Sequence, residues 1–188
     1  MKRIYILFAG LLSATAAQAQ STNTLMFGAR ALQATIAGPE STTVQSLQAR
    51  LGFFATQRLA LGLCLETGIN GNETIPYGIT LFSRWYAGKP GHQTLKFFVE
   101  AGAGIADNKY QQTEDIAAAK NWMKTAAYIS PGIDIFLGEV VALELAPEYR
   151  YISGEHAVHR LGISAGIKLF LSESVFKQTF PEKFKTLN

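Results

Sequence analysis

From residue 24 onwards, apolar and polar side chains alternate along one segment of the chain after another. The stretch 141–151 is the clearest example: its odd positions carry Val, Leu, Leu, Pro, Tyr and Tyr, and its even positions include Glu144, Glu148 and Arg150. A period of two places successive side chains on opposite faces of a β-strand. The pattern predicts eight strands, at 24–36, 43–55, 58–69, 75–87, 94–106, 124–137, 140–152 and 159–171.

The two faces of these strands differ in charge. One face is mostly apolar and carries no Lys, Arg, Asp or Glu, as Leu143 and Leu145 illustrate in the seventh strand. The other face carries seven basic and five acidic residues: Arg30, Arg50, Glu66, Arg84, Lys96, Glu100, Asp134, Glu144, Glu148, Arg150, Arg160 and Lys168. It also carries ten glycines: Gly28, Gly52, Gly62, Gly68, Gly78, Gly102, Gly104, Gly132, Gly162 and Gly166. Because glycine in a strand often marks close packing or a bend, this face is predicted to line a crowded, curved interior.

The free energy of burying charge decides which face points outwards. An Arg or Lys that faces lipid at the bilayer midplane costs roughly 2–4 kcal/mol, so seven of them would exceed the stability of a typical folded protein. The lumen of an eight-stranded barrel is only wide enough for side chains, which can pair there. We therefore predict an all-β fold, an eight-stranded antiparallel transmembrane up-and-down β-barrel with a plugged, salt-bridged lumen. A soluble barrel of lipocalin type would need the opposite arrangement and would aggregate.

Aromatic residues and connection lengths support this topology. Tyr77, Tyr149 and Tyr151 lie near one set of predicted strand ends, and Phe53, Trp85 and Phe97 lie near the other set, as expected of two interfacial girdles. The connections after the second, fourth and sixth strands are tight. The connections after the odd-numbered strands are longer, and the longest runs from Asp107 to Met123. Short periplasmic turns and longer outside loops are typical of such barrels.

The two ends of the chain fall outside the predicted barrel. Residues 1–19 combine basic Lys2 and Arg3 with an apolar run and the sequence Ala17-Gln18-Ala19, which predicts a cleaved signal peptide. The barrel domain is then expected at 20–171, and a periplasmic tail at 172–188 that is either frayed or anchored at the membrane interface. This organisation predicts an outer-membrane location in a Gram-negative bacterium. The expected partners are outer-membrane lipid and, during biogenesis, the secretion and barrel-assembly machinery.

Composition narrows the function further. Without Lys2 and Arg3 the chain has 15 basic and 14 acidic residues. The basic residues are scattered and form no stripe, which argues against binding to nucleic acid. Cys64 is the single cysteine, so no intramolecular disulfide is expected. No later segment is a long uninterrupted apolar run, so no membrane helix is expected in the mature chain.

Several segments also resemble, in order and spacing, the strands of a known family of small outer-membrane β-barrel proteins, the OmpX/OmpA-like barrels. The segments are Leu81-Phe82-Ser83-Arg84-Trp85-Tyr86, Phe97-Phe98-Val99-Glu100-Ala101-Gly102-Ala103-Gly104, Pro131-Gly132-Ile133-Asp134-Ile135-Phe136-Leu137 with Val141-Ala142-Leu143-Glu144, and Gly162-Ile163-Ser164-Ala165-Gly166-Ile167-Lys168. The resemblance implies the barrel fold and an outer-membrane location, and it implies no reaction. Barrels of this family usually end their last strand with an aromatic residue that serves as an assembly signal. The resemblance implies that Phe170 has this role, although a tail follows it in this chain.

The candidate chemistry is sparse. His156, His159 and Glu155 could bind zinc, but such a trio in a loop is common by chance. A lipid hydrolase could be assembled from Ser164, His159 or His156, and Glu148. The leading hypothesis is a non-enzymatic barrel without cofactor or metal, with a structural or surface-interaction role and a possible ligand contact at Asp107–Met123. The alternatives are a narrow porin-like channel for small solutes and a barrel-embedded lipid-modifying enzyme.

Overall fold

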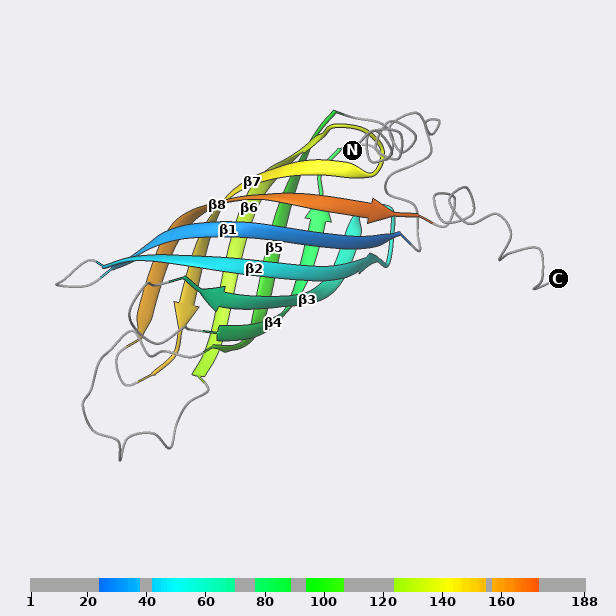
Figure 1. Cartoon of the computed structure of the whole chain (residues 1–188). Coiled ribbons are helices and arrows are strands. Elements are labelled where there is room, and N and C mark those ends of the chain that lie inside the picture. Colours follow the sequence, from blue (N-terminus) through cyan, green and yellow to red (C-terminus); the bar gives the residue numbers. More distant parts are fainter. Residues whose placement is uncertain are drawn as a thin grey trace, which may run out of the picture.

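The computed structural model describes residues 24–37, 42–69, 77–88, 94–106, 124–154 and 157–172. They form one closed barrel in which eight antiparallel strands follow one another in chain order (Figure 1). The strands are β1 (Leu25–Ala37), β2 (Thr42–Phe54), β3 (Leu59–Gly68), β4 (Tyr77–Tyr86), β5 (Leu95–Ala106), β6 (Lys124–Phe136), β7 (Val141–Ile152) and β8 (Val158–Leu171). The predicted fold class is confirmed, and each strand end lies within two residues of its predicted position.

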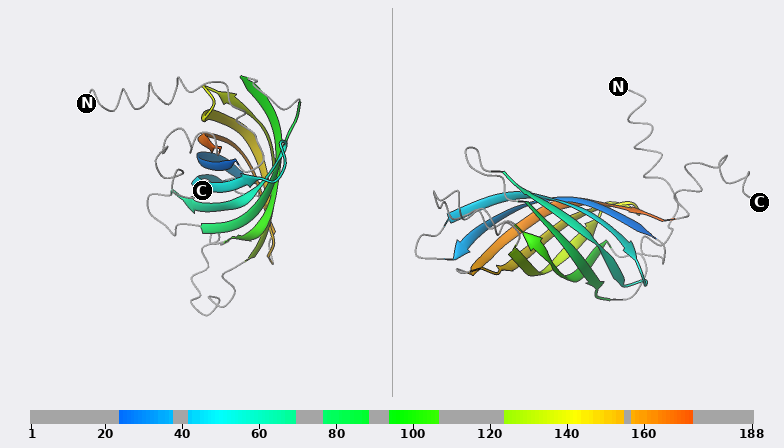
Figure 2. Two further views of the ribbon diagram at one scale, coloured as in Figure 1. Left: turned by 90° about the vertical axis from the view of Figure 1, so that its right-hand side faces the viewer. Right: turned by 90° about the horizontal axis from the view of Figure 1, so that it is seen from below.

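The register of the strands sets the shape of the barrel. A circuit of the barrel can be followed from each residue to its cross-strand partner on the next strand. Starting at Met26 of β1, the circuit passes through Gly52, Gly62, Phe82, Gly102, Tyr128, Arg150 and Arg160, and it returns to β1 at Ile36. The circuit therefore returns to β1 ten residues further along the strand. A barrel closed with such a shift has strands tilted by roughly 35–45°, and Figure 2 shows them running obliquely around the axis.

The two ends of the barrel are built differently. At the turn end, defined by the turns 55–58 and 137–140, Leu25 of β1 lies opposite Leu171 of β8. The first turn is held by the Ala55 N–H, which donates to the Leu59 carbonyl at 2.9 Å, and by Thr56 Oγ1, which accepts from two backbone N–H groups. The opposite end, the loop end, is where residues 38–41, 70–76, 107–123 and 155–156 connect the strands. These residues lie outside the described part of the chain.

The ladder between β6 and β7 is interrupted where Pro131 and Pro147 lie. The two strands pair as far as Ile129–Tyr149 and again from Ile133–Leu145, in the same register. Proline has no N–H to donate, so carbonyl groups of the partner strand lose their ladder bonds. The Ser130 side chain satisfies the β7 carbonyl that faces Pro131, because its Oγ donates to the Pro147 carbonyl at 2.8 Å. On the other side of β7, where the ladder to β8 is continuous, Ser164 Oγ donates to the Ala146 carbonyl at 2.9 Å.

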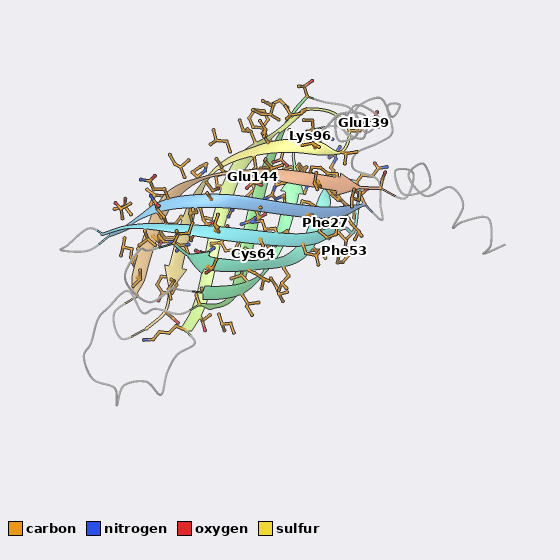
Figure 3. All side chains as sticks on the ribbon, viewed as in Figure 1. Phe27, Phe53, Cys64, Lys96, Glu139 and Glu144 are labelled. Carbon is orange, nitrogen blue, oxygen red and sulfur yellow. The ribbon has the colours of Figure 1, made fainter. Side chains whose placement is uncertain are left out.

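The outer wall of the barrel is mostly apolar. Large hydrophobic side chains are exposed on every strand, up to 69% for Leu81. Trp85, Phe53 and Phe97 are exposed on this wall near the turn end, and Tyr149 and Tyr151 near the loop end. Figure 3 shows Phe27 and Phe53 on β1 and β2. The side chain of Tyr77 is outside the described part of the chain.

A wall of this kind requires an apolar surrounding, because a soluble monomer rarely exposes such a large apolar surface. Within the described ranges, no helix is both long and apolar enough to cross a bilayer.

Candidate functional site

The lumen is closed at the turn end by an aromatic floor, which we define as Met26, Phe54, Tyr86, Phe98, Phe136 and Phe170. The rings of Phe136 and Phe170 have centroids 5.1 Å apart, and those of Phe54 and Tyr86 are stacked at 5.7 Å. Phe170, expected to act as an assembly signal, is only 1% exposed and belongs to this floor. The assembly role stays a prediction, because packing in the lumen does not test it.

Directly above the floor lies the first part of a buried ion network. Arg84 donates from Nε to Glu100 at 2.7 Å, and its Nη1 lies 3.0 Å from Glu144. Lys168 pairs with Asp134 at 2.7 Å and also with Glu144. Tyr86 connects the floor to this network, because its hydroxyl donates a 2.7 Å hydrogen bond to Asp134.

The second part of the network lies towards the loop end and depends on Glu66. Its carboxylate accepts from Arg150 and from Arg160, the latter at 2.6 Å, and Ser46 Oγ donates to it at 2.8 Å. Glu148 lies beside the same two arginines, 2.9 Å from Arg150 Nη2. Two carboxylates therefore compensate two guanidinium groups.

Arg30 joins the two parts of the network. Its Nη1 lies 2.9 Å from Glu144, and its Nη2 pairs with Glu148. Its Nε donates to Gln48, whose amide nitrogen in turn donates to Glu66 at 3.2 Å. Arg30 is on β1 and both its carboxylate partners are on β7, so these bonds join strands that are not neighbours in the barrel.

Aromatic rings separate several of the cations. Arg50 pairs with Glu100, and its guanidinium lies 5.5 Å from the Phe82 ring centroid and 5.8 Å from that of Tyr128. The guanidinium of Arg150 lies 4.9 Å from the same Tyr128 ring. Such cation–π contacts are attractive and stronger where water is excluded. Lys96 lies opposite Asp134 on the ladder, with its amine 5.4 Å from the ring centroid of the floor residue Phe136.

A second apolar layer covers the network at the loop end. Ala106, Ala126, Ile152 and Val158 form a buried cluster there, and Ile36 packs against it. We call these five residues the apolar cap. The charged groups are therefore enclosed between the aromatic floor and the apolar cap.

The glycines of the lumen face make room for these aromatic side chains. A Cβ on Gly62 would lie 2.6 Å from Phe82 Cζ, and a Cβ on Gly102 would lie 2.7 Å from Tyr128 Cζ. In each case the ring is the cross-strand partner of the glycine. These distances are shorter than a carbon–carbon contact allows, so the rings can lie there only because the opposing residue has no side chain.

All twelve residues named from the sequence as the lumen charge network are buried, none more than 8% exposed. Sequence reasoning did not single out the neutral members of the network, such as Ser46, Gln48 and the hydroxyl of Tyr86. They share the even residue numbers of the lumen face, so the same alternation could have found them.

The residues considered for catalysis do not come together as a triad built on His159. Ser164 is fully buried, with its hydroxyl engaged by the Ala146 carbonyl. His159 is on the outer face of β8, where its Nδ1 lies 2.8 Å from the Tyr149 hydroxyl. His156 and Glu155, considered for a metal site, lie outside the described residues. The described part of the chain holds no cluster of three metal-ligating side chains.

Solved structures place this architecture in a known fold class. The chain is similar to Neisserial surface protein A, with 14% identity and a TM-score of 0.59 over 77% of this chain and 96% of that one. It is also similar to the N-terminal β-barrel domain of OprF from Pseudomonas aeruginosa, with 17% identity and a TM-score of 0.54 over 79% and 99% of the two chains. A de novo designed transmembrane β-barrel matches with 14% identity and a TM-score of 0.50 over 82% and 100%.

The fold is thus that of the small eight-stranded transmembrane barrels, as the OmpX/OmpA-like resemblance implied. No family model matches the sequence, and no curated protein matches it. Because a designed barrel shares the fold, the architecture alone does not specify a biological role.

Proposed function

We propose that the chain is a non-conducting integral protein of the outer membrane of a Gram-negative bacterium, and that its barrel anchors loops that act outside the cell. The observation that carries this proposal is the ion network enclosed between the aromatic floor and the apolar cap. The apolar outer wall and the likeness to transmembrane barrels support the membrane location.

A permeating solute would have to separate ion pairs that cross the lumen. Arg30 on β1 pairs with Glu144 and Glu148 on β7, and these side chains have almost no solvent contact. Arg84 on β4 also pairs with Glu144, and this pair is equally buried. Removing one partner from a buried pair leaves a charge uncompensated, which typically costs about 3–5 kcal/mol. This barrier favours a closed plug over a solute pathway.

The loop end remains as the surface for recognition. Short turns of such barrels face the periplasm and longer loops face outwards, so we assign the loop end to the cell exterior. Its longest connection, residues 107–123, is the candidate contact for a surface ligand. Outer-membrane lipid is the expected partner of the folded barrel, and secretion and barrel-assembly factors are expected partners during biogenesis.

Two measurements test the proposal. Folded protein in outer-membrane fractions should migrate differently on gels before and after heating, and purified protein in planar bilayers should give no steady single-channel steps. A variant lacking residues 110–120 should remain equally silent, since the plug is in the lumen and not in the loop. Steady steps would overturn the plug, and a soluble protein without a heat shift would overturn the membrane location.

A further inference from the structure

The apolar band on the outer wall is not equally tall around the barrel. On each of β1, β2 and β3, counting from the turn end, the first four outward-facing residues are apolar and the fifth is polar. The polar residue is Gln33 on β1, Gln45 on β2 and Thr67 on β3. On β5, six apolar outward positions follow one another, from Leu95 to Ile105. We call the polar loop-end part of β1–β3 the polar sector: Gln33, Thr35, Thr43, Gln45 and Thr67, all exposed.

The difference is large compared with a bilayer. At about 3.3 Å per residue and a strand tilt of about 40°, the four positions from Leu25 to Ala31 span about 15 Å of membrane normal, and the six on β5 span about 25 Å. A band of about 25 Å matches the apolar belt expected of outer-membrane barrels. The band on β1–β3 is therefore too short for the bilayer that fits β5.

The register shows that the polar sector begins at a depth where the adjacent wall is still apolar. Thr35 is the cross-strand partner of Leu161 on β8, and Gln33 lies two residues nearer the turn end. Gln33 and Gln45 are directly opposite each other. Neither carboxamide has a hydrogen-bond partner among the described residues. In hydrocarbon, where no water is available, such groups would be strongly unfavourable.

We infer that the polar sector is a docking face for the headgroups of outer-leaflet lipids, where the membrane surface dips towards Gln33 and Gln45. The inference rests on the membrane location proposed above. A bilayer adapts to a short apolar band by local thinning at modest cost. The headgroups then approach the carboxamides and hydroxyls, which are uncharged and can both donate to phosphate oxygens and exchange hydrogen bonds with sugar hydroxyls.

The occupant is assigned as lipid because the polar sector is continuous with the outer aromatic girdle. His159, which accepts or donates a 2.8 Å hydrogen bond with Tyr149 and packs against the Tyr151 ring, is the cross-strand partner of Ala37 at the loop end of β1. Tyr side chains of this kind are typical of the headgroup level. The polar sector therefore opens directly onto the membrane surface and is not enclosed by apolar wall.

Depth measurements with a nitroxide probe test the inference. Single variants Gln33→Cys and Gln45→Cys are folded into phosphatidylcholine vesicles and then spin-labelled. The matched control pair is Ile79→Cys and Ile105→Cys, which are directly opposite each other on β4 and β5. The ten-residue shift of the register puts Ile79 close to the level of Gln33. The unsubstituted chain controls for labelling of Cys64, which is buried.

For each label we compare the rate of collision with a water-soluble nickel complex to the rate of collision with oxygen. The expected ratio of the nickel rate to the oxygen rate is severalfold higher at positions 33 and 45 than at positions 79 and 105. Equal, oxygen-dominated ratios at all four positions would overturn the docking face and leave the membrane barrel intact. Labels at 33 and 45 shielded from both reagents, with spin–spin broadening between chains, would identify a second copy as the occupant and also overturn it. Nickel-dominated ratios at all four positions would overturn the membrane location itself.

Discussion

Arg150 and Arg160 lie directly opposite each other on β7 and β8, although both are buried and positively charged. Like charges in this arrangement are destabilising. The pair is tolerated because Glu66 reaches it from β3 and bonds to both guanidinium groups, while Glu148 contacts both as well. Glu66 thus connects three strands, and its negative charge sets the electrostatics of this half of the lumen.

Replacing this charge at constant shape should destabilise the barrel strongly. For Glu66→Gln we expect a loss of about 3–5 kcal/mol in the free energy of unfolding, because two buried cations keep only Glu148 as an anionic partner. Denaturant unfolding in vesicles, followed by tryptophan fluorescence, measures the loss. Arg58→Gln, which removes a charge from the exposed turn at 55–58, is the control and should change stability by less than about 1 kcal/mol.

The glycine–aromatic packing gives a second prediction. The methyl group of Gly62→Ala would lie 2.6 Å from Phe82 Cζ and 2.7 Å from the Gly52 Cα, so we expect a loss of about 1–3 kcal/mol from overpacking. Gly78→Ala is the matched control, because its nearest contact would be the Ile105 carbonyl at 3.3 Å and little has to move. Thermal unfolding in detergent compares the two variants. Equal losses would contradict the steric explanation.

The outer wall gives a third prediction. Leu81→Arg places a charge at the most exposed position of the apolar band, and it should lower folding stability by about 2–4 kcal/mol in vesicles. Thr67→Arg, in the polar sector of β3, should cost only about 0–1 kcal/mol because charge is tolerated near the membrane surface. The fraction folded after dilution into vesicles reports both. A larger loss at position 67 than at position 81 would contradict the assigned depths.

Two serines that donate to β7 carbonyls give a fourth prediction. Ser130→Ala leaves the Pro147 carbonyl opposite Pro131 without a donor and should cost about 1–3 kcal/mol. Ser164→Ala removes one hydrogen bond to the Ala146 carbonyl, which faces the continuous β8 ladder, and should cost only about 0.5–1.5 kcal/mol. Ser83→Ala, on the lipid-facing side of β4, is the control and should be close to neutral. Hydrogen exchange of β7 amides, together with denaturant unfolding, distinguishes the sites. Unchanged stability in Ser164→Ala would argue against a structural role for this hydroxyl.

The alternation of apolar and polar residues was enough to predict the strands and their two faces, because every residue of a barrel wall faces either lipid or the crowded lumen. The same alternation identified the charged residues of the lumen, from Arg30 to Lys168. It did not predict which of these residues form ion pairs with one another. Arg30 finds Glu144 and Glu148 only through the ten-residue shift of the closed register, and no local pattern encodes that shift.

Two further features of the barrel could be recognised only from the strand register of the structure. Phe170 reads as a terminal aromatic in the sequence, but its even position turns it into the lumen beside Phe136. Pro131 and Pro147 look unremarkable as outward residues of separate strands. Their placement on adjacent strands, which produces the interrupted ladder, becomes visible only once β6 and β7 are aligned.

The ion pairs of Arg30 also bear on the rates of folding and unfolding. Its partners Glu144 and Glu148 are 114 and 118 residues away in sequence, so these bonds form only when β1 and β7 have been brought into one barrel. Contacts of such sequence separation form late and contribute little to the start of folding. Interactions absent from the transition state slow unfolding and leave the folding rate nearly unchanged. The lumen network therefore contributes kinetic stability: it slows unfolding and so extends the lifetime of the inserted barrel, without accelerating its insertion.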